Sequence, residues 1–151
     1  MKYNYNALDT FAKAVADYMD TPGEVVVTMY NPGIPLREEV NSVGLFSDKN
    51  LKEKAETRLK FDLGVIWGIG CIVVRDELHL NVELHLYDFM SEALKRTSNF
   101  GFNENPSIIH GLIEKADNES RNMGDTHPFN MGVMFSETFL HKFYEVKFTP
   151  N

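Results

Sequence analysis

The feature that most constrains this chain is an alternation of apolar and other residues on either side of Arg75-Asp76. Before that pair, every second residue from Phe61 to Val73 is apolar, and after it every second residue from Leu78 to Leu86 is apolar. Successive side chains of a strand point to opposite faces, so a period of two predicts strands at 61–74 and 77–87. The short connection between them predicts an antiparallel hairpin.

Burial selects the register of that hairpin. A two-residue loop places Val73 opposite Leu78 and Trp67 opposite Leu84, so every pair on this face is apolar. A slip of one residue would turn the polar residues of the second strand onto the Trp67 face. Cys71 falls on the apolar face, which favours a small core residue over a nucleophile.

The other segments predict helices and further strands. Apolar residues at helical spacing predict a helix over 8–19 that Asn6 caps. Asn105-Pro106 is a typical helix start. Beyond these, the patterns predict strands at 24–30, 40–46, 129–135 and 140–148, helices at 48–58 (capped by Ser47), 88–97 and 105–116, and loops at 31–35, 98–104 and 117–127.

Two assignments have alternatives. The period of two reaches back to Ala55, so the strand at 61–74 either begins several residues earlier or follows a helix at 48–58. The last strand, at 140–148, has a helix as its alternative, because helical spacing also relates Leu140, Phe143, Tyr144 and Lys147.

Strands that come as hairpins, with helices at either end, indicate an α+β fold. We expect a single antiparallel sheet of about four to six strands, with an N-terminal helix and two or three further helices packed on it. The 151 residues suit one domain over 1–151.

Charge and cysteine content narrow the function classes. A net charge of −7 argues against direct nucleic-acid binding, and its spread among Lys and Arg argues against an acidic mimic of nucleic acid. The single Cys71 excludes an intrachain disulfide and zinc sites with several cysteines. No apolar run reaches the length of a signal peptide or a membrane helix. We expect a cytoplasmic protein in a reducing compartment, or one within an assembly formed there, without membrane contact.

The second face of the hairpin carries the candidate ligand site. Three glycines of one strand lie beside a row of polar side chains on the other, and glycine within a strand often marks a close approach of another group. The candidate residues are Gly64, Gly68, Gly70, His79, Asn81, Glu83, His85 and Tyr87. The alternative is a solvent-facing sheet surface on which Tyr87 covers Gly64. The two histidines would lie about 20 Å apart along the strand, so we expect no metal site and no cofactor.

Aromatic and methionine side chains crowd the C-terminal region. The candidate interface residues are Phe129, Met131, Met134, Phe135, Phe139, Phe143 and Tyr144. Such residues are enriched at the centres of protein interfaces, although the alternative is an ordinary core. If both faces of the last hairpin are apolar, both need to be covered, which favours self-association.

The sequence contains no coherent catalytic constellation. Asp125-Thr126-His127 at the end of a polar loop fits ordinary turn chemistry better than a site. The leading hypothesis is a non-enzymatic protein-interaction or assembly subunit that associates with itself or with a protein partner, as a structural component or an inhibitor. The alternative is a small-ligand binder or hydrolase that uses the polar, glycine-floored face of the 61–87 hairpin.

Overall fold

The computed structural model describes residues 2–21, 34–40, 44, 47–96 and 106–143, and these residues form helices and turns with no strand. The predicted α+β fold with an antiparallel sheet is therefore wrong. The elements in chain order are α1 (Tyr5–Asp20), α3 (Arg37–Val40), α4 (Lys49–Ile72), the π-helical turn η1 (Val73–Glu77), α5 (Val82–Arg96), α6 (Pro106–Ser120), the 3-10 turn η2 (Gly124–Thr126) and α7 (Pro128–Phe143).

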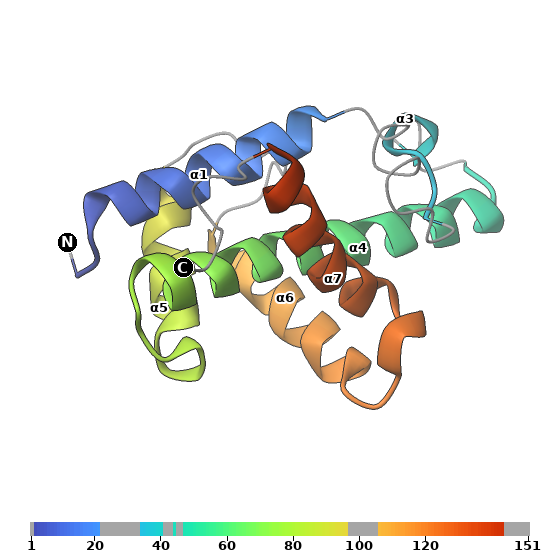
Figure 1. The fold of residues 1–151 in the computed structure, drawn as a ribbon. Helices are drawn as coiled ribbons and strands as arrows, with labels where there is room; N and C mark the ends of the chain where they lie inside the picture. Colours follow the sequence, from blue (N-terminus) through green and yellow to red (C-terminus); the bar gives the residue numbers. More distant parts are fainter. Residues whose placement is uncertain (1, 22–33, 41–43, 45–46, 97–105, 144–151) are drawn as a thin grey trace.

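Helix α4 is the central element, and the other helices pack around it (Figure 1). Helix α1 lies along one side of α4 and α6 on the other, α7 crosses α4, and α5 contacts α1 as well as α4 and α6. The core is aromatic where α1, α4 and α7 meet. Tyr18 contacts the rings of both Phe135 and Phe139, and Phe61 packs on Phe135. All four of these side chains are almost fully buried.

Small residues make the crossing of α4 and α7 close. A Cβ atom added to Gly132 would lie 2.1 Å from the carbonyl oxygen of Phe61, and one added to Gly64 would lie 2.1 Å from that of Phe129. One turn further along α4, a Cβ on Gly68 would meet the Ser136 hydroxyl at 2.0 Å. The backbones approach closely because Gly64, Gly68 and Gly132 have no side chain at the contact.

The predicted strand at 61–74 is wrong because α4 is buried on nearly all sides there. Phe61 to Ile66 and Gly68 to Gly70 are all buried, so no polar face reveals the helical period. An apolar run of this kind fits a buried helix as well as a strand. Residues 73–77 then continue α4 as a π-helical turn, where a hairpin turn was predicted.

The predicted strand at 77–87 is wrong as well. Val82, Leu86, Phe89, Met90 and Ala93 form one apolar helical stripe, and all but the partly buried Val82 are buried. By contrast, Leu84, which the strand pattern placed in the core, is 76% exposed. The helix expected at 88–97 is thus the second part of a longer helix that begins at Val82.

The turn between η1 and α5 explains where the helix breaks. His79 adopts a left-handed conformation with φ of 55°, and the Leu80 N–H donates to the Val74 carbonyl at 3.0 Å. This bond is typical of the C-terminal cap in which a left-handed residue ends a helix. Asn81 then caps α5, since its side chain accepts a hydrogen bond from the Leu84 N–H at 3.1 Å.

The predicted N-terminal helix is confirmed, and its apolar stripe is buried. Its cap is Asn4 rather than Asn6, because the Asn4 side chain accepts from the Asn6 N–H. The helix at 48–58 is also confirmed as the start of α4, with Asp48 rather than Ser47 as its cap. Helix α6 begins at Pro106 as expected, and it runs on to Ser120 where a loop was predicted.

Helix α7 replaces the predicted strand at 129–135 and the first residues of the one at 140–148. Its buried face consists of residues at helical spacing: Phe129, Gly132, Phe135, Ser136 and Phe139. Val40 belongs to α3. Several predicted segments lie outside the described residues: the strand at 24–30, the loop at 98–104, residues 144–148, most of the strand at 40–46 and most of the loop at 31–35. Among the described helices, none combines the length and apolar character that a membrane span requires.

Candidate binding groove between helices α4 and α6

The structure separates the eight residues of the predicted ligand site. Gly64 and Gly68 lie against α7, and Gly70 lies against Leu86 and Met90 of α5. His79 and Asn81 form the turn before α5. The sheet face on which the ligand-binding hypothesis rested does not exist among the described residues.

The remaining three candidates belong to α5. His85 faces α1, where its Nδ1 lies 3.3 Å from the Tyr3 hydroxyl. Glu83 and Tyr87, one helical turn apart, line the same cavity beside Trp67. Two of the eight predicted residues therefore line one cavity, and the other six do not line it.

The predicted interface residues lie mostly inside the molecule. Phe129, Phe135 and Phe139 are buried, Met131 is partly buried and packs on the core, and Met134 is 46% exposed. Phe143 ends α7, and Tyr144 lies outside the described residues. The structure therefore assigns most of this aromatic cluster to the core, the alternative that the sequence left open.

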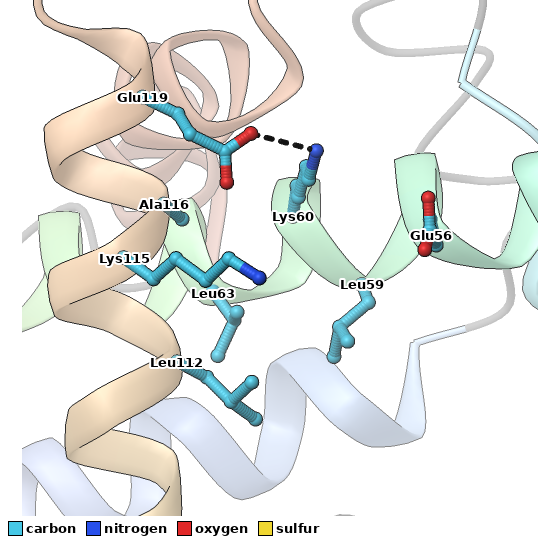
Figure 2. Close-up of a pocket in the computed structure, with 8 residues that line it drawn as sticks. All are labelled: Glu56, Leu59, Lys60, Leu63, Leu112, Lys115, Ala116 and Glu119. Carbon is cyan, nitrogen blue, oxygen red and sulfur yellow. Dashed lines mark hydrogen bonds and ion pairs between the residues drawn. The ribbon is translucent and has the colours of Figure 1, made fainter.

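A groove between α4 and α6 is a site that the sequence patterns missed. It is a hollow of about 390 Å³, which we call the α4–α6 groove. Its lining residues are Glu56, Leu59, Lys60 and Leu63 of α4 and Leu112, Lys115, Ala116 and Glu119 of α6. Figure 2 shows the three leucine side chains grouped on one side of the groove and the charged side chains around it.

One ion pair bridges the two helices at the edge of the groove. The Lys60 ammonium lies 3.1 Å from the Glu119 carboxylate, and both side chains are partly exposed (Figure 2). The hydrogen bond and charge of Lys60 lower the pKa of Glu119. Lys115 and Glu56 form no ion pair with any residue that the structure describes. The groove therefore combines an apolar patch with one cation and one anion that form no ion pair with a described residue, although the charge of Lys115 also helps to lower the pKa of Glu119.

His127 lies near the Lys60–Glu119 pair and caps α7. Its Nδ1 accepts a hydrogen bond from the Phe129 N–H at 3.1 Å, and Pro128 occupies the first helical position. Burial and the nearby Lys60 ammonium lower the pKa of His127, while Glu119 acts in the opposite direction. An acceptor Nδ1 requires the neutral ring, so the cap depends on the protonation state of His127.

A buried polar network holds α1 to α4. The Tyr18 hydroxyl donates to Asp62 at 2.5 Å, and Arg58 donates from Nε to the same carboxylate at 3.0 Å. Arg58 also donates to the Pro35 carbonyl at 3.1 Å and to Tyr18 at 3.3 Å. Arg58 and Asp62 are 1% and 5% exposed. These groups are aimed at one another, so the network serves to position helices.

The Cys71 thiol and the potential metal ligands are the remaining reactive side chains of the described residues. Burial raises the pKa of the Cys71 thiol to about 12, which keeps the thiolate rare near neutral pH. Among the described residues, no three His, Cys, Asp or Glu side chains are grouped as a metal site would require.

The chain matches no protein-family model, no curated protein and no solved structure.

Proposed function

We propose that this chain is a non-enzymatic assembly subunit that associates with a second copy of itself through the α4–α6 groove. The observation that carries the proposal is the self-complementary charge of the groove. Lys115 lies on α6 and Glu56 on α4, and neither forms an ion pair with a described residue. A groove with one unmatched charge of each sign suits a partner with the same pair in reverse order.

Twofold symmetry supplies that reverse order. In an isologous dimer, a contact from one residue to another is repeated with the roles exchanged. Figure 2 places Lys115 on one side of the groove and Glu56 further along α4 on the other. An axis through the groove brings Lys115 of each copy to Glu56 of its partner, so one surface provides two ion pairs.

The apolar part of the groove adds the association energy. Leu59 and Leu112 are only partly buried within one copy, although they pack on the core. Their exposed area would be removed from water in the dimer, at about 25 cal/mol per Å². The Lys60–Glu119 pair is matched within its own chain and would form part of the polar rim.

Sedimentation-velocity ultracentrifugation over a range of concentrations tests the proposal. We expect the wild-type chain to form a dimer, and each of Lys115→Glu and Glu56→Lys to weaken it about tenfold or more, because each creates two like-charge contacts. The double variant, Glu56→Lys with Lys115→Glu, restores both pairs in exchanged positions and should dimerise again.

The control is Lys13→Glu, which makes the same charge change on an exposed position of α1. It should leave the dimer unchanged. A wild-type chain that stays monomeric at every concentration contradicts the proposal. So does a double variant that is no better than the two single variants.

A further inference from the structure

A second hollow lies at the C-terminal half of α4 and shares no residue with the α4–α6 groove. Its volume is about 510 Å³, within the range typical of small-molecule sites. We call it the aromatic cavity. Its lining residues are Trp67 and Cys71 of α4, Val82, Glu83, Leu86 and Tyr87 of α5, and Asp117 and Arg121 of α6.

Two aromatic rings form a corner of this cavity. The rings of Trp67 and Tyr87 lie 5.3 Å apart with an interplanar angle of 69°. Further aromatic contacts hold both in place, since the Tyr87 ring lies 4.2 Å from the His110 ring at an interplanar angle of 47°, and the Trp67 ring lies 6.1 Å from that of Phe129. Proteins bind quaternary ammonium groups against the faces of tryptophan and tyrosine rings, and the exposed parts of these two rings line the cavity.

The lining of the cavity carries two carboxylates, Glu83 and Asp117, and one cation, Arg121. Asp117 pairs with Arg121 at 3.3 Å, and the Arg121 side chain is 67% exposed. Glu83 is exposed and has no ion pair with a described residue. The neutral Cys71 thiol adds no charge. Burial, and then the negative charges of Asp117 and Glu114, raise the pKa of Tyr87, while the Arg121 cation acts in the opposite direction.

We infer that the aromatic cavity binds an organic ammonium ion. The ammonium group lies at the corner of Trp67 and Tyr87, and Glu83, the carboxylate without an ion pair, balances its charge. The apolar part of the ligand packs on Val82 and Leu86. The net charge of −7 on the whole chain also raises the local concentration of cations.

Trp67 is the only tryptophan of the chain, so its fluorescence reports directly on the cavity. The first experiment titrates the wild-type protein with choline at constant ionic strength, with isothermal titration calorimetry alongside. The matched control ligand is dimethylbutanol, which has the shape of choline and no charge. We expect a saturable change in Trp67 fluorescence with choline, and binding about tenfold weaker for the alcohol.

Variants then locate the binding site. Glu83→Gln and Asp117→Asn should each weaken choline binding severalfold, and Asp117→Asn more strongly because it also releases the Arg121 cation into the cavity. Glu53→Gln is the matched control, since it removes one exposed negative charge at the other end of α4. It should bind choline like the wild type.

Three results would overturn the inference. The first is an absence of saturable binding by both fluorescence and calorimetry. The second is equal affinity for choline and dimethylbutanol, and the third is an equal effect of Glu83→Gln and Glu53→Gln. None of these variants alters a residue of the α4–α6 groove, so this test and the dimerisation test fail or succeed separately.

Discussion

A methyl group added at Gly132 tests the close crossing of α4 and α7. The new Cβ would lie 2.1 Å from the Phe61 carbonyl oxygen and 2.9 Å from the Val65 nitrogen. Both are backbone atoms of α4 and cannot rotate away. Since non-bonded heavy atoms settle at about 3.5–4.0 Å, the helices would have to separate by roughly an ångström or more.

The cost follows from that separation. Overpacking costs about 1–3 kcal/mol, and a crossing made by rigid backbone belongs at the upper end. Alanine regains about 1 kcal/mol of helix propensity over glycine, which leaves Gly132→Ala about 2 kcal/mol less stable than the wild type. Gly111→Ala in α6 is the matched control, because its Cβ would have no atom within 4 Å and keeps the full gain of about 1 kcal/mol.

Thermal and urea unfolding followed by circular dichroism measure both variants. The difference of about 3 kcal/mol between them corresponds to roughly 6–12 °C in Tm for a chain of this size. Equal stability of Gly132→Ala and Gly111→Ala would refute the close crossing, since the clash would then be absent.

Two further predictions concern ionisable groups. Because burial lowers the pKa of His127 and of His110 in the folded state, the unfolded chain binds more protons, and stability should fall as the pH drops below about 6.5. His127→Asn keeps a capping side chain that does not titrate, so its urea midpoint should change less between about pH 8 and pH 5 than that of the wild type. His127→Ala should lose about 1 kcal/mol of stability at pH 8. An equal change of the urea midpoint with pH in His127→Asn and in the wild type would contradict this. Asp62→Asn should cost about 3–5 kcal/mol in urea unfolding because it leaves the buried Arg58 charge unbalanced. Lys60→Met, which breaks the partly exposed pair with Glu119, should cost no more than about 1 kcal/mol, and a similar cost for both would contradict a structural role for the buried network.

Helices with one polar face were predictable from the sequence. In α1, Leu8, Phe11 and Val15 form the buried stripe that their spacing indicates, while Lys13 and Asp17 are exposed. Pro106 likewise predicted where α6 begins. Both signals are local, so they do not depend on what packs against the helix.

The middle of the chain was not predictable in this way, because α4 is surrounded. Contacts from α1, α5, α6 and α7 leave it without a continuous polar face from Phe61 to Val74, and glycines replace side chains where α7 crosses. The apolar residues and glycines of this segment produced the alternation with a period of two by coincidence, without a strand. The apolar stripe from Val82 through Phe89 and Met90 was the competing signal, and Leu84 was the residue on which the two patterns disagreed.

The start of α7 was missed for a different reason. Proline at the first helical position is the signal that located α6, and Pro128 offers the same signal. The residue before it is His127, which is not among the common capping residues. Its imidazole nitrogen nevertheless accepts the bond that a Ser or Asp oxygen accepts elsewhere.

Glu83 and Tyr87 remained together although the predicted secondary structure was wrong. Residues four apart share a face in a strand, where the period is two, and also in a helix, where it is 3.6. Residues two apart share a face only in the strand, which is why His85 moves to the α1 side of α5 while its neighbours line the aromatic cavity. A candidate pair spaced by four is therefore less sensitive to an error in secondary structure.

One stripe of α4 links the two proposed surfaces. Lys60, Leu63, Trp67 and Cys71 follow one another at intervals of three or four, and α6 crosses this stripe. The near side of α6 borders the groove with Leu112 and Ala116, and its other side borders the cavity with Asp117 and Arg121. A change in the buried face of α6 would disturb both hollows together. Rim charges such as Glu56 and Glu83 are therefore the positions at which dimerisation and cation binding separate.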